Sequence, residues 1–215
     1  EKVRPQILEQ LAQGQTLALV SDAGMPLISD PGFKLIEAVI EAGIEPEVIP
    51  GPTALTSALV LAGLPTDRFF FAGFMPQKQG GRRSGLEELK AIPATLVFYE
   101  GPSRLANFLT DAAEILGDRQ AAVSREITKL YEQTKRGSLS ELADLYHATG
   151  APKGEIVVTI APPLAPEPTG DEELEQLLRV ALDKNSLKDA VESVTNITGL
   201  KKKLVYARAL ELKNT

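Results

Sequence analysis

The stretch Val20-Ser21-Asp22-Ala23-Gly24-Met25-Pro26-Leu27-Ile28-Ser29-Asp30-Pro31-Gly32 decides how the first part of this chain is expected to fold. It follows the apolar run Leu17–Val20 and precedes residues with helical apolar spacing. Its small residues, Asp and Pro are typical of a loop after a strand. Asp30 is predicted to be the N-cap of the next helix, with Pro31 as its first residue. Because ligands bind beyond the carboxyl ends of strands in open α/β sheets, this loop is predicted to face a ligand.

A second loop of the same kind follows later in the chain. Pro50-Gly51-Pro52-Thr53 comes after a strand predicted over Glu45–Ile49, and Thr53 is expected to cap a helix that runs to Ala62. With a strand over Thr16–Val20 and the helices around it, the order is αβαβα. This order is typical of a parallel sheet with helical crossovers, in which two successive loops can line one cleft.

The pattern after Arg68 predicts a second α/β domain with a mixed sheet. Strand-like runs occur at Phe69–Phe74, Thr95–Glu100, Ala121–Glu126, Lys129–Lys135 and Glu155–Ala161. Helices are predicted to begin at Ser84, Ser103 and Ser138. The first and last of these Ser residues are followed three residues later by Glu, which is the pattern of a capping box.

The C-terminal part is predicted to be a separate helical domain. Four prolines within Pro162–Pro168 favour a stiff linker. Three short apolar-periodic helices follow, and the turn at Gly199 between the last two resembles a helix-turn-helix. The expected domains are therefore 1–66 for the remainder of a first α/β domain, 67–162 for the second, 163–170 for the proline-rich linker and 171–215 for the helices.

Composition excludes several kinds of site. The chain has 215 residues and no Cys, which rules out disulfides and thiolate metal sites and fits a reducing cytoplasm. No His, Asp or Glu group has metal-ligand spacing, so no metal is expected. No apolar run approaches the roughly 20 residues that a membrane span needs. G-x-G-x-x-G and Walker A motifs are absent, which weighs against a dinucleotide dehydrogenase.

The net charge of −6 is unusual for a nucleic-acid-binding protein, but two local groups of residues are basic. Lys78, Arg82 and Arg83 fall in a predicted loop, Pro76–Arg83, without an acidic neighbour in sequence. Residues Asn196–Thr215 include five basic side chains and one acidic side chain. Both groups are candidates for contact with an RNA backbone, and the alternative for each is an ordinary solvated surface.

Several motifs together resemble the ribosomal RNA small subunit methyltransferase I family, which belongs to the tetrapyrrole (corrin and porphyrin) methylase superfamily. The motifs that carry the resemblance are Ser21–Gly32, Pro50–Ala54, Gly63–Phe69, Gly73–Pro76, Phe98–Glu100, Arg125–Lys129 and Lys153–Glu155. The resemblance covers nearly all of the chain. In the family, a segment before these motifs supplies the first strands and a Gly-containing loop that touches the cofactor. We do not expect that segment within this sequence.

The resemblance implies two α/β domains with a cofactor cleft between them, a small C-terminal helical domain and a homodimer. It implies transfer of a methyl group from S-adenosylmethionine to a ribose 2′-hydroxyl of cytidine in small-subunit (16S) ribosomal RNA. The expected cofactor-binding residues are Ser21, Asp22, Ala23, Gly24, Pro26, Leu27, Thr53, Ala54 and Tyr99. A helix N-terminus at Thr53 suits a carboxylate because its amides are unpaired.

Charged residues at the ends of two predicted strands are candidates for catalysis and RNA binding. The expected catalytic residues are Glu100, Glu126 and Lys129. The expected RNA-binding residues are Lys78, Arg82, Arg83, Arg104, Lys201, Lys202 and Lys203. The alternative for Glu100 is a solvent-facing charge, and the alternative for the Arg125–Lys129 cluster is a rim network of ion pairs.

Two other functions stay open at this point. The same scaffold methylates tetrapyrrole rings in related families, although a small ring needs neither a basic loop nor C-terminal helices. A non-catalytic RNA-binding protein is the third possibility. Cofactor titration separates the third from the first two functions, and methyl transfer to RNA or to a porphyrinoid separates those two.

Overall fold

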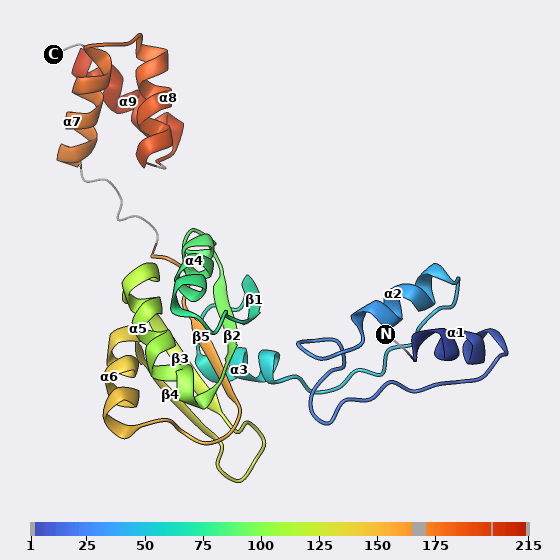
Figure 1. Cartoon of the computed structure of the whole chain (residues 1–215). Helices are drawn as coiled ribbons and strands as arrows, with labels where there is room; N and C mark the ends of the chain where they lie inside the picture. The colour runs from blue at the N-terminus through green and yellow to red at the C-terminus, as the bar shows by residue number, and fades with distance from the viewer. Residues whose placement is uncertain (1–2, 165–170, 199, 214–215) are drawn as a thin grey trace. The chain divides into compact units, whose positions relative to one another are not determined.

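The computed structural model describes residues 3–164, 171–198 and 200–213 (Figure 1). It divides into two compact units, Glu1–Pro163 and Leu164–Thr215. Most of the predicted linker and the turn residue Gly199 lie outside the described residues. The boundary expected between residues 66 and 67 falls inside the first unit and stays a prediction, as do the other domain limits.

A five-stranded mixed sheet forms the centre of the first unit, as the sequence predicts. Its strands are β1 (Phe69–Phe74), β2 (Thr95–Glu100), β3 (Gln120–Arg125), β4 (Gln133–Ser138) and β5 (Ile156–Ile160), in the order β1-β2-β5-β3-β4. β1 is parallel to β2, and the other neighbouring pairs are antiparallel. β4 begins later than predicted because Lys129–Glu132 forms a turn, in which Glu132 N–H donates to the Lys129 carbonyl oxygen at 3.1 Å.

Alternate residues along the sheet serve two different cores. On one face, Leu96 and Phe98 pack under three helices, α4 (Gln79–Leu89), α5 (Leu105–Leu116) and α6 (Leu139–Thr149). On the other face, Val97 and Val157 pack against α3 (Ala54–Ala62). Figure 1 shows α5 and α6 side by side on one side of the sheet and α3 on the other.

Two of the predicted helix caps are confirmed. Ser138 Oγ accepts a hydrogen bond from the Glu141 amide at 3.3 Å, and Glu141 returns the contact to the Ser138 amide at 2.8 Å. Thr53 Oγ1 accepts from the Thr56 amide at 3.2 Å, so α3 begins where its sequence indicates. These local side-chain contacts satisfy amides that have no partner inside the helix.

The two other Ser caps in this unit are wrong. α4 begins at Gln79 instead of after Ser84, and it includes glycines that the sequence pattern assigned to a loop. Of these loop glycines, Gly81 has a packing role, since a Cβ atom there would lie 3.2 Å from Pro76 Cβ; Gly85, in the predicted helix, is packed as closely, with its Cβ position 2.5 Å from Met75 Cε. α5 begins after a 3₁₀ turn at Pro102–Arg104, which includes Ser103.

The strands predicted over Thr16–Val20 and Glu45–Ile49 are also wrong. Both segments are irregular, and Val20 and Ile49 are each 81% exposed. A strand is stable only when its backbone groups bond to a neighbour, and no segment of the described chain pairs with either one. The helices α1 (Arg4–Ala12) and α2 (Phe33–Glu41) on either side of the first segment do form.

Asp30 is not the N-cap of α2, because its carboxylate is used inside the preceding loop. Ser21 Oγ donates to Asp30 Oδ2 at 2.6 Å, which ties the two ends of that loop together. The residue before α2 is Gly32, whose φ of 136° few side chains tolerate. The loop therefore closes on itself before the helix begins at Phe33.

The C-terminal unit contains three helices, as predicted, within its described residues. They are α7 (Asp171–Leu182), α8 (Leu187–Thr198) and α9 (Lys202–Lys213). Their own apolar core consists of Leu174, Leu178, Val191, Val194, Val205 and Ala209. Ser186 Oγ accepts from the Asp189 amide at 3.3 Å and caps α8. Among the described helices, none is long and apolar enough to cross a membrane.

Because each unit has a separate core, removal of residues after Pro168 is expected to leave the first unit folded. Urea unfolding of the truncated chain, followed by circular dichroism, should retain a single cooperative transition. A broad, non-cooperative loss of signal in the truncated chain would contradict this expectation and would make the helical unit part of the first core.

Candidate functional site

A cleft of about 420 Å³ opens at the carboxyl ends of β1 and β2. Its walls come from three parts of the chain: the first loop, the start of α3 and the ends of the strands. The lining residues are Ala23, Gly24, Met25, Ile28, Pro52, Thr53, Ala54, Ser57, Phe74, Tyr99, Glu100, Gly101, Pro102, Ile127, Thr128, Lys129, Gly154, Glu155, Ile156 and Val157. The cleft therefore lies at strand ends, but at those of β1 and β2, because the strands predicted before its first two loops are not formed.

The packing of α3 on the sheet brings the second and third walls of the cleft together. Ala58 and Leu59 of this helix pack against the sheet on the face that holds Val97. At its other end, Arg136 Nε donates to the Leu61 carbonyl oxygen at 3.0 Å. A guanidinium suits this position because the last carbonyl groups of a helix carry partial negative charge.

Tyr99 forms an aromatic wall at the end of β2. Its ring lies edge-on to Phe71 and Phe74, with centroid distances of 4.9 and 5.6 Å. Burial raises the pKa of the Tyr99 hydroxyl, and a hydrogen bond from the Leu55 backbone amide opposes that rise. The hydroxyl therefore stays protonated at neutral pH and lies beside the first turn of α3.

Glu100 is a buried carboxylate in the cleft wall. It is only 3% exposed, so the alternative of a solvent-facing charge is wrong. Its Oε1 atom accepts from the Gly101 amide and from the Arg104 guanidinium, each at 2.6 Å. Arg104 therefore neutralises the charge of Glu100. Its contact with RNA stays a prediction, which requires the guanidinium to bind Glu100 and an RNA phosphate at the same time.

Glu126, Lys129 and Glu155 form a charged cluster at the rim of the cleft. Lys129 Nζ lies 3.1 Å from Glu126 Oε1 and 2.9 Å from Glu155 Oε2. The Glu155 backbone amide and then Lys129 lower the pKa of Glu126. Hydrogen bonds to Glu155 and Glu126 raise the pKa of Lys129. Both groups therefore stay charged at neutral pH, which makes Glu126 a weaker base than an ordinary carboxylate and prevents Lys129 from acting as a base.

Two loops of the cleft hold unusual backbone conformations. Within the described chain, the non-glycine residues with positive φ are Leu27 (71°), Ser29 (62°), Glu126 (49°) and Thr128 (66°). Such conformations carry strain and persist only where surrounding contacts fix them, which is common at ligand sites. Here the contacts are the Ser21 bond to Asp30 and the bond from the Glu155 amide to Glu126, at 3.0 Å.

The cleft includes only part of the predicted cofactor-binding set. Ala23, Gly24, Thr53, Ala54 and Tyr99 line it. Ser21, Asp22, Pro26 and Leu27 do not, and Ser21 instead braces the loop from inside.

Several other lining residues had no predicted role, among them Ser57, Gly154 and Glu155. Gly154 and Glu155 belong to the Lys153-Gly154-Glu155 motif, which could have indicated their place in the site. Gly154 has a φ of 98°, and the space where its Cβ atom would lie is filled by the Glu126 side chain. Among the described residues, no three His, Cys, Asp or Glu side chains come together as metal ligands, either inside or outside the cleft.

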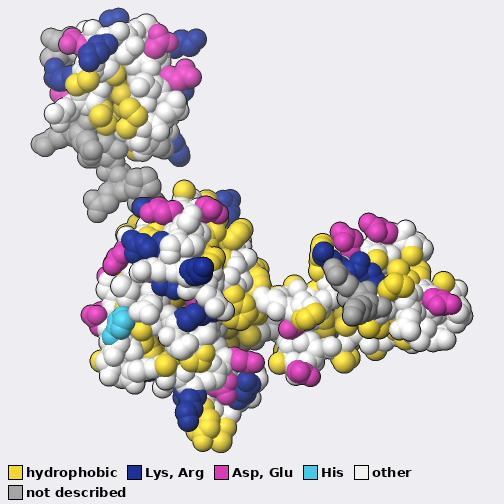
Figure 2. Space-filling view, in the orientation of Figure 1, with side chains coloured by type: hydrophobic (Ala, Val, Ile, Leu, Met, Phe, Trp, Pro, Cys, Tyr) yellow, Lys and Arg dark blue, Asp and Glu magenta, His cyan; other side chains and the backbone are white. Residues whose placement is uncertain are grey.

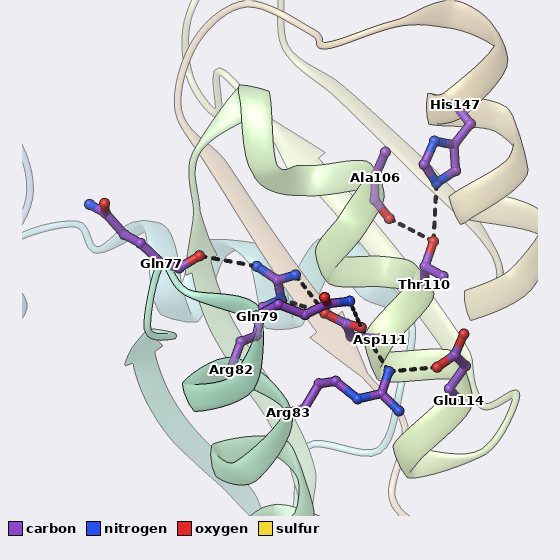
Figure 3. Close-up of polar contacts among 9 residues, drawn as sticks. All are labelled: Gln77, Gln79, Arg82, Arg83, Ala106, Thr110, Asp111, Glu114 and His147. Atoms are coloured by element: carbon purple, nitrogen blue, oxygen red, sulfur yellow. Dashed lines mark hydrogen bonds and ion pairs between the residues drawn. The ribbon is translucent and has the colours of Figure 1, made fainter.

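The predicted basic loop is instead the start of α4, and one of its arginines is buried. Arg82 is 6% exposed, and its guanidinium pairs with Asp111 of α5 at 2.5 Å (Figure 3). Arg83 reaches Asp111 at 2.9 Å and Glu114 at 2.5 Å. The acidic partners are distant in sequence and adjacent in space. A backbone-gripping role for Arg82 is therefore wrong, because its charge is already compensated inside the protein.

Asp111 receives several donors at once. Burial alone would raise the pKa of its carboxyl group, but hydrogen bonds from Arg82, Arg83 and Gln79 outweigh burial and hold the pKa below its ordinary value. Figure 3 shows these donors converging on Asp111 from α4. The Arg82–Asp111 ion pair therefore joins α4 to α5. Its contribution to stability is lost only when acid protonates the Asp111 carboxylate.

The remaining predicted RNA-binding residues lie on the surface. Lys78 is exposed at the start of α4, and Lys201, Lys202 and Lys203 are exposed at the start of α9. None of these four lysines has an ion-pair partner within the described residues. Their contact with RNA stays a prediction.

Comparison with known proteins identifies similar sequences over nearly the whole chain. The family model described as Tetrapyrrole (Corrin/Porphyrin) Methylases matches residues 1–143, and the model described as RsmI C-terminal HTH domain matches residues 168–213. The chain is 48% identical to Ribosomal RNA small subunit methyltransferase I of Mesorhizobium japonicum, over 98% of this chain and 72% of that protein. It is 42% identical to the protein of the same name from Pseudomonas aeruginosa, over 95% and 74%.

Solved structures share the fold at much lower identity. The methyltransferase CobJ has a TM-score of 0.55 and 21% identity, with coverage of 75% of this chain and 70% of that chain. Diphthine synthase has a TM-score of 0.55 and 17% identity, with coverage of 75% and 65%. These neighbours confirm the predicted tetrapyrrole methylase-like α/β fold.

Replacement of Arg82 by Met is expected to destabilise the first unit by about 3 kcal/mol, because Asp111 would lose its buried partner. Replacement of the half-exposed Arg83 by Met is the matched control and should cause a much smaller loss. Urea unfolding midpoints of the two variants measure the difference. Equal midpoints would show that the buried pair contributes no more than the exposed one.

Proposed function

The chain belongs to the ribosomal RNA small subunit methyltransferase I family, and from this membership we propose that it methylates small-subunit (16S) ribosomal RNA, using S-adenosylmethionine. The proposed acceptor is the ribose 2′-hydroxyl of a cytidine. One observation carries the proposal: six of the seven motifs that define the resemblance contribute residues to one cleft. Ala23–Met25, Pro52–Ala54 and Tyr99–Glu100 are distant in sequence and line the same cavity.

The residues of the cleft fit a ligand of this size and chemistry. A volume of about 420 Å³ lies within the range of small-molecule sites, roughly 300–1,000 Å³. At Gly24, φ is 73° and a Cβ atom would meet nothing within 4 Å, so a ligand can approach the backbone there. In the first turn of α3, the Leu55 and Thr56 amides are bonded to Tyr99 and Thr53, which leaves the Ala54 amide for a carboxylate, and Tyr99 offers an apolar ring.

S-adenosylmethionine, when bound, supplies an electrophilic methyl group. The residues we propose to hold it are Ala23, Gly24, Thr53, Ala54 and Tyr99, which are the predicted residues that line the cleft. The hydrogen bond from Ser21 to Asp30 would hold the strained backbone of this loop, at Leu27 and Ser29, in place before the ligand arrives.

Among the predicted catalytic residues, Glu100 is our candidate for the general base. A ribose hydroxyl is a weak acid, so a carboxylate in the cleft wall assists its deprotonation. Arg104 orients that carboxylate through the 2.6 Å contact. Lys129 keeps its positive charge and is suited to an RNA phosphate, and Glu126 positions Lys129.

RNA is favoured over a tetrapyrrole ring by the identity of the relatives. The named ribosomal RNA methyltransferases reach 48% identity, whereas CobJ reaches 21%. The partner we propose is therefore the small ribosomal subunit or its RNA. We also propose that the protein acts as a homodimer in the cytoplasm, where ribosomes assemble.

The direct test of this function is transfer of labelled methyl from S-adenosylmethionine. The full chain is expected to label small-subunit ribosomal RNA transcribed in vitro, which carries no methyl groups, and to leave a porphyrinoid unlabelled. Label on the porphyrinoid alone would support tetrapyrrole methylation instead. Binding of RNA without label on either substrate would support a non-catalytic role.

Replacement of Gly24 by Val is expected to weaken S-adenosylmethionine binding at least about tenfold, measured by calorimetry, because a branched side chain would enter the cleft. Gly43→Val is a closely matched control. Gly43 has the same φ of 73° and the same empty surroundings, but it does not line the cleft. Equal affinity in the two variants would move the cofactor away from Gly24.

Replacement of Lys201–Lys203 by Ala is expected to flatten the salt dependence of RNA binding. The slope of log affinity against log salt should fall by about 2, because each phosphate contact with single-stranded RNA contributes about 0.7. A control with Lys34, Lys90 and Lys184 replaced by Ala changes the net charge equally. If both triple variants lower the slope to the same degree, the effect reports net charge instead of a contact by α9.

A further inference from the structure

The loop between β3 and β4 ends in a turn with an unusual composition. Lys129 and Glu132 close the turn through a backbone hydrogen bond of 3.1 Å, which leaves Leu130 and Tyr131 at its two central positions. Gly, Asn, Asp, Pro and Ser usually occupy such positions, since they accommodate the turn backbone and solvent. Here an aliphatic and an aromatic side chain occupy them.

Both side chains point into solvent. Leu130 is 88% exposed and Tyr131 is 66% exposed. The loop protrudes at the lower end of the sheet in Figure 1, and Figure 2 shows hydrophobic atoms at the same end with charged side chains beside them. Neither side chain is buried within its own chain, so both are available to contact a partner.

The turn is held in place by its polar residues. Glu132 Oε2 accepts from the Thr128 amide at 2.6 Å, and Lys129 Nζ joins the turn to Glu155 at 2.9 Å. Glu126 and Thr128 adopt positive φ, which restricts the backbone on the side that leads into the turn. The polar side chains therefore anchor the turn from within, and the two apolar side chains are presented in a fixed position.

The location of the turn identifies what it contacts. Ile127, Thr128 and Lys129, which lead directly into the turn, line the cleft, so Leu130 and Tyr131 lie at its rim. A nucleotide in the cleft has neighbours in its strand, and a base on the Lys129 side of the cleft would pass over this rim. Bases in single-stranded RNA commonly stack on exposed aromatic side chains.

A subunit contact explains the pair less well. A stable protein interface needs roughly 800 Å² from each partner, which two side chains at a narrow turn do not supply alone. One stacked base needs only one ring face.

We propose that Tyr131, supported by Leu130, stacks on a base of the RNA that flanks the target nucleotide and so positions the substrate strand over the cleft. This inference rests on the proposed function, because it takes the substrate to be single-stranded RNA. It assigns the turn a role in substrate placement, separate from cofactor binding and from proton transfer at Glu100.

The test compares Tyr131→Ala with Tyr131→Phe in the full chain, on in-vitro-transcribed small-subunit ribosomal RNA. The Ala variant is expected to raise the KM for RNA about tenfold, the order expected for one stacked base, with kcat and cofactor affinity unchanged. The Phe variant keeps the ring and should match the wild type. Val60→Ala, which trims an 80% exposed side chain on α3, is the control for loss of apolar surface.

A second measurement does not depend on methyl transfer. The chain has no Trp, so the Tyr131→Trp variant carries a single fluorescent reporter at the turn. Addition of the same RNA should quench its emission as a base stacks on the indole.

The outcomes separate the inference from the proposed function. If the wild type methylates RNA but Tyr131→Ala has an unchanged KM, the inference is wrong and the function stands. If the wild type transfers no methyl group, the function fails, and quenching of the Tyr131→Trp variant still decides whether RNA meets the turn. If Tyr131→Ala changes only the sedimentation of the protein, the turn is a subunit contact and the inference is overturned.

Discussion

The packing of Ala58 and Leu59 against Val97 and Val157 joins the two parts of the chain that make the cleft. One part supplies loops, and the other supplies the sheet. Because these apolar side chains fix α3 on the sheet, the first turn of α3 lies beside the end of β2. Arg136 secures the opposite end of the helix through carbonyl groups of its last turn. Without this contact, neither the loops nor the strand ends alone would enclose a ligand.

The cleft is built before any ligand binds. Its first loop is closed by the hydrogen bond from Ser21 to Asp30, and its second loop is fixed by the bond from the Glu155 amide to Glu126. Both loops contain strained residues that these contacts hold in place. Such bracing lets a ligand bind without a large loss of backbone entropy. It also leaves Glu100, the general base that we propose, as the buried carboxylate of the cleft wall, since Glu126 serves the backbone.

Local signals in the sequence predicted local features well. The capping box at Ser138 and the alternation of inward and outward side chains along the strands each depend on a few neighbouring residues. The family motifs indicated which loops meet. Contacts between distant residues were not predictable in this way. Arg82 looked solvent-exposed because Asp111, its partner, lies far along the chain. Gly81 looked like part of a loop because its close packing against Pro76 is visible only in space. The apolar run Thr16–Val20 looked like a strand, but strand formation depends on a partner that no local pattern contains.

The most direct test of this account is a crystal structure of the chain with S-adenosylhomocysteine, the product form of the cofactor. The account predicts density for the product between Gly24 and the first turn of α3, in contact with Tyr99. Density beside Tyr99 with Gly24 free of contact would leave the site in place but change the role of the first loop. Density outside the cleft, with the product bound elsewhere on the first unit, would contradict the assignment of the cleft as the methyl-transfer site.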